Sequence, residues 1–258
     1  MTRIIHLSDL HFGTEDSQTT FFLQNKIMDL NPNLIIISGD FTQSASHGEF
    51  TTAQNFLTSL PAPYLCVAGN HDIPAHNLIE RFLSPYRRYK KYISSQLEPQ
   101  LRYDHIEIIG LNTARRALPH WNWANGAINE KQLEKIVNDP LSKGIKRRLC
   151  VLHHPVHKAE GSPLKVKVFG GKKALKAFEH SNVDLVLTGH VHHASIETFE
   201  KKNGRRLIFV SASTTLSSRT RSQGNGFNVI DIDDSAINIE FYQLASDGFQ
   251  KTEEHHFA

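Results

Sequence analysis

The chain has 258 residues, of which 39% are hydrophobic and 21% are charged, a balance typical of a soluble globular protein. Its 29 lysines and arginines against 26 aspartates and glutamates leave a formal charge of +3, too small to indicate a general affinity for nucleic acid or membranes. The two cysteines, Cys66 and Cys150, both lie in apolar runs, which argues against a disulfide framework and makes a reducing cytoplasm the expected location.

The first part of the chain predicts strands and helices in turn, over residues 3–8, 19–30, 34–37, 49–60 and 63–68. This alternation is typical of a parallel sheet, whose strands all end at one edge. Polar residues follow each of the three strands, namely Asp9 and His11, then Gly39-Asp40, then Gly69-Asn70-His71-Asp72. Open α/β sheets build their sites at this edge.

The middle of the chain is less regular. Its basic, tyrosine-containing segment 78–92 predicts one helix, which is either an ordinary solvated face or a surface that steers phosphate. Further elements are expected over residues 103–111, 129–137, 148–152, 174–180 and 183–187. Two of these strands end in histidine-rich runs, His153-His154 and His190-Val191-His192-His193. The Gly- and Lys-rich segment 157–173 is long enough to be a mobile flap.

From residue 195 onward the pattern changes to strands separated by turns, expected in antiparallel arrangement over residues 196–199, 207–212, 227–232 and 237–244. A parallel first half and an antiparallel second half indicate two sheets that face each other with helices outside. The chain shows no internal repeat and no linker, so we predict a single domain over 1–258, with 195–245 mainly antiparallel strands.

Seven oxygen and nitrogen donors follow the predicted strands, namely Asp9, His11, Asp40, Asn70, His153, His190 and His192. They are too many for one tetrahedral ion and suit two ions that share a carboxylate, for which Asp40 is the natural bridge. Two dications roughly 3.5–4 Å apart can hold a bridging hydroxide and clamp a phosphoryl group for in-line displacement. Imidazole and carboxylate suit Mn, Fe or Zn almost equally, so the metal identity stays open.

The blocks Asp9-x-His11, Gly39-Asp40, Gly69-Asn70-His71-Asp72, His153 and Gly189-His190-x-His192 resemble the signature of the calcineurin-like metallophosphoesterases. The resemblance spans residues 9 to 192. It implies an α/β (α+β) fold, a four-layer αββα sandwich of two mixed β-sheets flanked by helices. It further implies one metal held by Asp9, His11, Asp40 and His192, and a second held by Asp40, Asn70, His153 and His190. His71 is then the catalytic residue that contacts the substrate phosphate and stabilises the transition state or protonates the leaving oxygen.

Details within the superfamily favour one branch. The Asp-Arg-Gly of protein Ser/Thr phosphatases is absent after Asp40, and Asp72 stands where those enzymes carry Glu. By contrast, three stretches of the chain resemble the class III cyclic-nucleotide phosphodiesterase branch, namely Leu60-Pro61-Ala62-Pro63, Gly126-x-Ile128-x-x-x-Gln132-Leu133 and His153-His154-Pro155. That branch often has an acidic residue where Gln43 stands. This departure bears on the assignment of the substrate and not on the assignment of the metal ligands. The resemblance implies hydrolysis of a small phosphodiester, such as a cyclic nucleotide, by a metal-bridging hydroxide.

Several alternatives stay open at this point. Asp72 either orients His71 or caps the turn, and His154 and His193 either orient ligands or are ordinary histidines. A lipid-linked pyrophosphate hydrolase with peripheral membrane contact is a second reading, motivated by the basic segments 81–92 and 157–173. A nuclease and a catalytically silent scaffold complete the set. We expect a small phosphoester as partner, no nucleic acid and no membrane span, since no apolar run approaches the roughly 20 residues that a span needs. The oligomeric state stays open.

Overall fold

The computed structural model describes the chain apart from residues 138–139, 159–160, 163–165, 219 and 221–222. Helices are α1 (Ser17–Leu30), α2 (His47–Thr58), α3 (Leu78–Leu83), α4 (Arg87–Tyr92), α5 (Glu130–Val137) and α6 (Gly171–His180). One sheet comprises β1 (Thr2–Leu7), β2 (Leu34–Ile37), β3 (Tyr64–Cys66), β12 (Gly226–Ile232), β13 (Ile237–Ala245) and β14 (Gly248–Phe257). The other comprises β4 (Gln100–Tyr103), β5 (Ile106–Leu111), β7 (Arg147–Leu152), β9 (Leu185–Thr188), β10 (Ser195–Glu200) and β11 (Arg206–Ser211). A small pair joins β6 (Gly126–Ala127) to β8 (Val168–Phe169).

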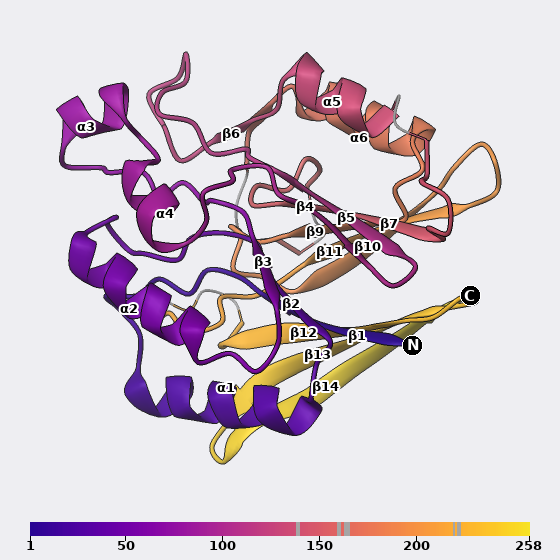
Figure 1. The fold of residues 1–258 in the computed structure, drawn as a ribbon, viewed down its shortest axis with the longest axis horizontal. Coiled ribbons are helices and arrows are strands. Elements are labelled where there is room, and N and C mark those ends of the chain that lie inside the picture. Colours follow the sequence, from indigo (N-terminus) through magenta and orange to yellow (C-terminus); the bar gives the residue numbers. More distant parts are fainter. Residues whose placement is uncertain (138–139, 159–160, 163–165, 219, 221–222) are drawn as a thin grey trace.

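The two large sheets lie face to face between two layers of helices (Figure 1). The strand order is β14-β13-β12-β1-β2-β3 in the first sheet and β10-β11-β9-β7-β5-β4 in the second. In the first sheet, β1, β2 and β3 are parallel to one another at one end, and β12, β13 and β14 continue the sheet with antiparallel pairs. In the second sheet, the parallel strands β11, β9, β7 and β5 lie in the middle, and β10 and β4 flank them with antiparallel pairs. The α/β prediction of a four-layer αββα sandwich with two mixed sheets is therefore confirmed.

Alternating side chains explain why the central strands are apolar throughout. In β2, Leu34 and Ile36 pack into the core between the sheets, whereas Ile35 and Ile37 face the core beneath α1, α2 and α4. In β7, Val151 faces the core between the sheets, and alternate residues face α5 and α6. Because both faces of each sheet are covered, these strands read as unbroken apolar runs.

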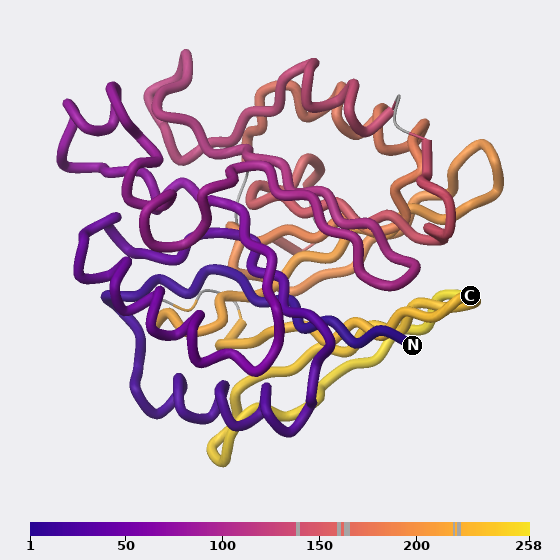
Figure 2. The backbone as a smooth tube through the Cα atoms, viewed as in Figure 1, coloured from indigo at the N-terminus to yellow at the C-terminus, as the bar shows by residue number. Residues whose placement is uncertain are grey.

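The second half of the chain does not form a sheet of its own, contrary to the sequence prediction. β10 and β11 join the second sheet, where β11 pairs antiparallel with β10 but parallel with β9. β12 to β14 extend the first sheet instead, and Figure 2 shows these yellow strands lying beside the indigo start of the chain. A parallel partner for β11 leaves no signal in its own residues, because β11 is buried as deeply as the earlier strands.

Local differences also have physical reasons. The segment predicted as one helix over 78–92 forms α3 and α4, because Pro85 follows the Ser84 cap and cannot continue a helix. The strand predicted over 103–111 is a β4–β5 hairpin that turns at Asp104, whose φ is 52°. Within the predicted flap 157–173, β8 and the first turn of α6 are ordered elements. Residues 159–160 and 163–165 of the predicted flap lie outside the described residues.

Candidate metal centre

Five strand ends meet at one edge of the facing sheets, and all seven predicted ligands follow them directly. The strands concerned are β1, β2, β3, β7 and β9, which precede Asp9 and His11, Asp40, Asn70, His153, and His190 and His192. Both chain termini lie at the opposite edge, on the right of Figure 1. Side chains from residues 9 to 192 therefore reach one place because the parallel strands share one direction.

Five of these residues have left-handed backbone conformations. Their φ angles are 51° for Asp9, 48° for His11, 53° for Asp40, 69° for His190 and 53° for His192. Such a conformation costs a non-glycine residue about 1–3 kcal/mol and persists only where the surroundings enforce it, commonly at functional sites. The backbone thus holds these side chains in a costly arrangement at a single location.

The first group of donor atoms surrounds Asp9. His192 Nε2 lies 3.2 Å from Asp9 Oδ1 and 3.2 Å from His11 Nε2, and His11 Nε2 lies 3.7 Å from the same carboxylate oxygen. The other oxygen, Asp9 Oδ2, accepts hydrogen bonds from Ser8 Oγ at 2.5 Å and from the His190 backbone N–H at 2.9 Å. These two bonds fix the carboxylate so that Oδ1 faces the imidazoles.

The second group surrounds Asp40. His153 Nε2 lies 3.2 Å from Asp40 Oδ2 and 3.3 Å from His190 Nδ1. His153 Nδ1 donates to the Ser38 carbonyl at 2.8 Å, which leaves the Nε2 lone pair directed into the site, as in metal-binding histidines. His11 Nε2 lies 3.8 Å from Asp40 Oδ2, so Asp40 adjoins both groups.

Three glycines allow the blocks to approach one another this closely. A Cβ on Gly69 would overlap Asp40 Oδ1, and one on Gly189 would overlap Ser8 Oγ and approach Asp9 Oδ2 to 2.5 Å. A Cβ on Gly39, whose φ is 101°, would lie 2.7 Å from His153 Nδ1. Gly69 is therefore needed for space beside the carboxylate.

The electrostatics match a buried cation site. Burial by itself raises the pKa of the Asp9 and Asp40 carboxyls, but the neighbouring imidazoles hold both pKa values well below their usual range. Burial opposes charge on His153, yet the Asp40 carboxylate raises its pKa to about 9. Burial, helped by His153, lowers the pKa of His190 to about 3. Two ionised carboxylates are thus buried together, a state that proteins normally compensate with cations.

The donor chemistry fits metal ions. Asn70 Oδ1 is buried and accepts no hydrogen bond from the part of the chain that the structure describes, and the same holds for Asp9 Oδ1. Buried polar atoms of this kind are usually satisfied, so an acceptor that points into a nitrogen- and oxygen-lined site indicates an absent partner. The nitrogen, carboxylate and amide donors together fit two divalent or transition metal ions.

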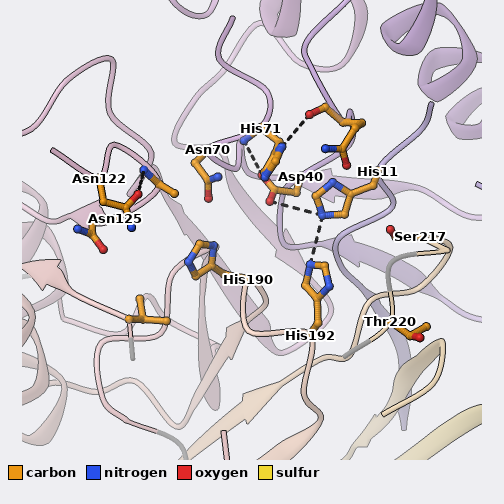
Figure 3. A pocket seen from close by; sticks show the side chains of 13 residues that line it. His11, Asp40, Asn70, His71, Asn122, Asn125, His190, His192, Ser217 and Thr220 are labelled. Atoms are coloured by element: carbon orange, nitrogen blue, oxygen red, sulfur yellow. Dashed lines mark hydrogen bonds and ion pairs between the residues drawn. The ribbon is translucent and has the colours of Figure 1, made fainter. Parts of the chain in front are cut away.

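A cavity of about 420 Å³ opens above the donor groups. Figure 3 shows His11, Asp40, Asn70, His190 and His192 directed toward one space, with Asn122 and Asn125 on one side.

His71 lines the same cavity. Its Nδ1 donates to the Gln43 carbonyl at 2.7 Å, and its backbone N–H donates to Asp40 Oδ1 at 2.8 Å. A ring nitrogen of His71 also lies within 4.8 Å of donor atoms of His11 and Asp40. This ring is thus held at the edge of the donor groups, and among the described residues none is hydrogen-bonded to its Nε2.

The hydrogen bonds of Asp72 distinguish its two predicted roles, orienting His71 or capping the turn. Its Oδ1 accepts from the Thr42 N–H at 3.1 Å and the Thr42 hydroxyl at 3.2 Å, and its Oδ2 accepts from the Gly69 N–H at 2.9 Å. Burial, followed by the nearby Asp40, raises the pKa of Asp72 to about 7. Asp72 therefore ties two loops together, and the Gln43 carbonyl orients the His71 ring instead.

His154 is satisfied by protein groups at both ring nitrogens. Nδ1 lies 2.8 Å from the Thr113 hydroxyl, and Nε2 donates to the Ala124 carbonyl at 3.0 Å. Although its ring approaches the His190 ring to 4.4 Å, it is best described as a brace between β7 and the loop before β6. His193 lies beside Gly161, and its role stays a prediction.

Sequence reasoning missed the groups that support the site through backbone or hydroxyl contacts. Ser8 and the Gln43 and Ser38 carbonyls orient predicted residues, and Thr214 Oγ1 donates to the Asp9 carbonyl at 2.7 Å. The loop after β11 also brings Ser217 into the cavity wall. Its run of serines and threonines was the available signal, although such runs are common in ordinary loops.

Comparison with known proteins decides the family. A model of the calcineurin-like phosphoesterases matches residues 2–194. The chain belongs to the calcineurin-like phosphoesterase family.

A probable cyclic nucleotide phosphodiesterase of Ruthia magnifica is 26% identical over 210 residues, which cover 80% of this chain and 81% of the relative. A UDP-2,3-diacylglucosamine pyrophosphatase of Chlamydia muridarum is 36% identical over 74 residues, covering 27% of this chain and 22% of the relative. The fold is similar to a dimetal phosphatase from Danio rerio, with a TM-score of 0.69 at 12% identity, covering 99% of this chain and 98% of the other.

Family membership confirms the predicted superfamily and enzyme class, a metal-dependent phosphoester hydrolase. The relatives named as cyclic nucleotide phosphodiesterases also confirm the resemblance to that branch. In the described part of this calcineurin-like phosphoesterase, no helix is both long and apolar enough to span a membrane.

Proposed function

We propose that this protein is a phosphodiesterase that hydrolyses a small phosphodiester, with a cyclic nucleotide as the leading substrate class. The observation that carries the proposal is the convergence of seven donor side chains beneath one cavity. In the proposed site, one metal is held by Asp9, His11, Asp40 and His192, and the second by Asp40, Asn70, His153 and His190. Relatives with phosphodiesterase names support the diester preference.

The metals, when bound, supply activated water and neutralise charge on the phosphoryl oxygens. The proposed metal-loaded site attracts an anion, because only Asp9 and Asp40 contribute negative charge and Asn70 is neutral. A third carboxylate in place of Asn70 would remove the net positive charge that attracts a phosphate. We assign the transition metals Mn, Fe or Zn to the site on the ground that imidazole nitrogens outnumber carboxylates.

His71 is the proposed catalytic residue. Donation from Nδ1 to the Gln43 carbonyl fixes the ring and leaves Nε2 toward the cavity. From there Nε2 can contact a phosphoryl oxygen and pass a proton to the departing alkoxide, a contribution of about 10²–10⁴-fold for a positioned acid. The carbonyl partner also explains why Gln43 can differ from the acidic residue of the resembled branch, since the side chain takes no part in this bond.

A substrate panel tests the proposal. The protein is stripped with a chelator, reloaded with manganese, and assayed on cyclic nucleotides, bis(p-nitrophenyl) phosphate, phosphomonoesters and nucleotide diphosphate conjugates. We expect turnover that requires metal and favours diesters, together with about two metals per chain by elemental analysis. Absence of metal-dependent turnover on every phosphoester would leave only a silent scaffold.

Hydrolysis of a lipid-linked pyrophosphate is a second candidate. It is supported by the local similarity to a pyrophosphatase of that kind and by apolar side chains exposed near the cavity. Leu78, Ile79 and Leu83 of α3 are 53%, 75% and 80% exposed, and Trp121 is 88% exposed. Sedimentation with anionic vesicles at low salt separates the candidates, because a membrane-acting enzyme should pellet and lose binding in Ile79→Ser. Protein that stays in the supernatant speaks for a substrate free in solution.

A further inference from the structure

A second cavity, of about 240 Å³, adjoins the proposed catalytic cavity. The two share four lining residues, Gln43, Asn70, His71 and Ala124. Because His71 is the proposed donor to the leaving oxygen, the group attached to that oxygen would extend from the metals past His71 into this side cavity. The volume lies below the roughly 300–1,000 Å³ of pockets for drug-sized ligands, so it suits one compact substituent.

An aromatic side chain, Trp123, and a buried cation, Arg81, line the side cavity and do not line the proposed catalytic cavity. Trp123 lies against Phe82, with ring centroids 5.8 Å apart and an interplanar angle of 89°. The Arg81 guanidinium carbon lies 5.1 Å from the Trp123 ring centroid. These two contacts hold the Trp123 side chain in place, and Trp123 is one of the residues that line the cavity.

Arg81 is unusual because it is only 4% exposed and is bound by backbone carbonyls alone. Its Nε donates to the Arg116 carbonyl at 2.7 Å, and its Nη1 donates to the carbonyls of Ile73 and Pro74 at 3.4 Å and 3.1 Å. Within the described residues, no carboxylate pairs with it. A buried charge without a counter-charge is costly, so an occupant rich in acceptor atoms would be favoured over a purely aliphatic one.

The side cavity is also attached to the metal centre. His154, which follows the proposed ligand His153, donates to the Ala124 carbonyl and so braces the residue next to Trp123. Arg81 joins the loop at Ile73 and Pro74, just after His71, to the loop at Arg116. The position of Trp123 relative to His71 is thereby set by hydrogen bonds on both sides.

We propose that this side cavity is the subsite for the nucleobase of the substrate, with Trp123 stacking on the base and Arg81 donating to its ring or carbonyl acceptors. The inference rests on the proposed function, since it places the ester substituent beside His71. Stacking of a base on an aromatic side chain contributes about 1–3 kcal/mol, which corresponds to roughly 5- to 150-fold in affinity.

Three ligands of increasing size test the subsite by calorimetry on the manganese-loaded protein, namely inorganic phosphate, ribose 5-phosphate and adenosine 5′-monophosphate. We expect the nucleotide to bind at least about fivefold more tightly than ribose 5-phosphate. Trp123→Ala should remove that difference and leave the affinity for inorganic phosphate unchanged. Trp123→Phe keeps an aromatic face and should retain part of the difference in affinity. It replaces the alanine variant in this test if the alanine variant does not fold.

Trp121→Ala is the matched control, because Trp121 is two residues away, is 88% exposed and does not line the cavity. It should keep the full preference for the nucleotide. The subsite is refuted if the wild type binds nucleotide and ribose 5-phosphate equally, or if Trp123→Ala keeps the preference. The subsite is also refuted if hexyl phosphate binds more tightly than methyl phosphate while the base adds no affinity. Failure of all three ligands to bind would instead count against the proposed function.

Discussion

Replacing Gly69 by alanine probes how tightly the candidate metal centre is assembled. Gly69 follows β3, and a Cβ at this position would overlap both Asp40 Oδ1 and the Asp40 backbone nitrogen. The carboxylate that adjoins both donor groups must therefore move, or the two loops must separate. Overpacking of this kind costs about 1–3 kcal/mol in stability. Because Asp40 is displaced, metal affinity should fall by about 10–100-fold, the usual loss when a ligand loses its support.

Gly48→Ala is the matched control for this experiment. A Cβ on Gly48 meets nothing within 4 Å, and the residue lies in the first turn of α2. The control should keep full metal content and stabilise the fold by up to about 1 kcal/mol through helix propensity. Metal content after dialysis against a manganese buffer, turnover and thermal unfolding are measured for both variants. Normal metal content and turnover in Gly69→Ala would refute the close approach of Gly69 to Asp40.

Three further outcomes are expected. His71→Ala should lower turnover by about 10²–10⁴-fold while two metals stay bound, and unchanged turnover would remove its catalytic role. Burial lowers the pKa of His6 to about 3, below its unfolded value near 6.5. The neutral His6 side chain therefore makes its full contribution to the free energy of unfolding above pH 6.5. This contribution is lost as the pH falls toward 3, by about 1.4 kcal/mol per pH unit. Urea unfolding at pH 7 and pH 5 should show a smaller acid loss in His6→Gln than in the wild type, and equal losses would contradict this. Ser46→Ala breaks the capping box with Glu49 and should cost α2 about 1 kcal/mol in the same assay, with turnover retained.

The sequence was informative where function requires a particular side chain. The predicted ligands Asp9 to His192 could be placed at strand ends because apolar runs such as 34–37 stop abruptly at polar residues. The hairpin at Asp104 shows the limit of such reasoning, because propensity alone does not mark where a short element ends. The break before Pro85, by contrast, had a signal in the sequence, because proline cannot continue a helix. β14 escaped prediction since it is an edge strand with mostly exposed polar residues and no apolar alternation.

Supporting contacts were the least predictable part of the site. The Ser38 and Gln43 carbonyls that orient His153 and His71 belong to the backbone, so no residue type announces them. The left-handed conformations of five predicted ligands also have no signature in the sequence, since aspartate and histidine occur in many conformations. These features follow from how the loops pack once the strands are in place.

The central claim is that seven side chains hold two metal ions next to His71. Anomalous diffraction from crystals of the manganese-loaded protein tests it most directly. The account predicts two peaks about 3.5–4 Å apart, with Asp40 between them and the Asn70 amide oxygen on one ion. A single ion, or manganese bound away from Asp9, Asp40 and their histidines, would contradict it.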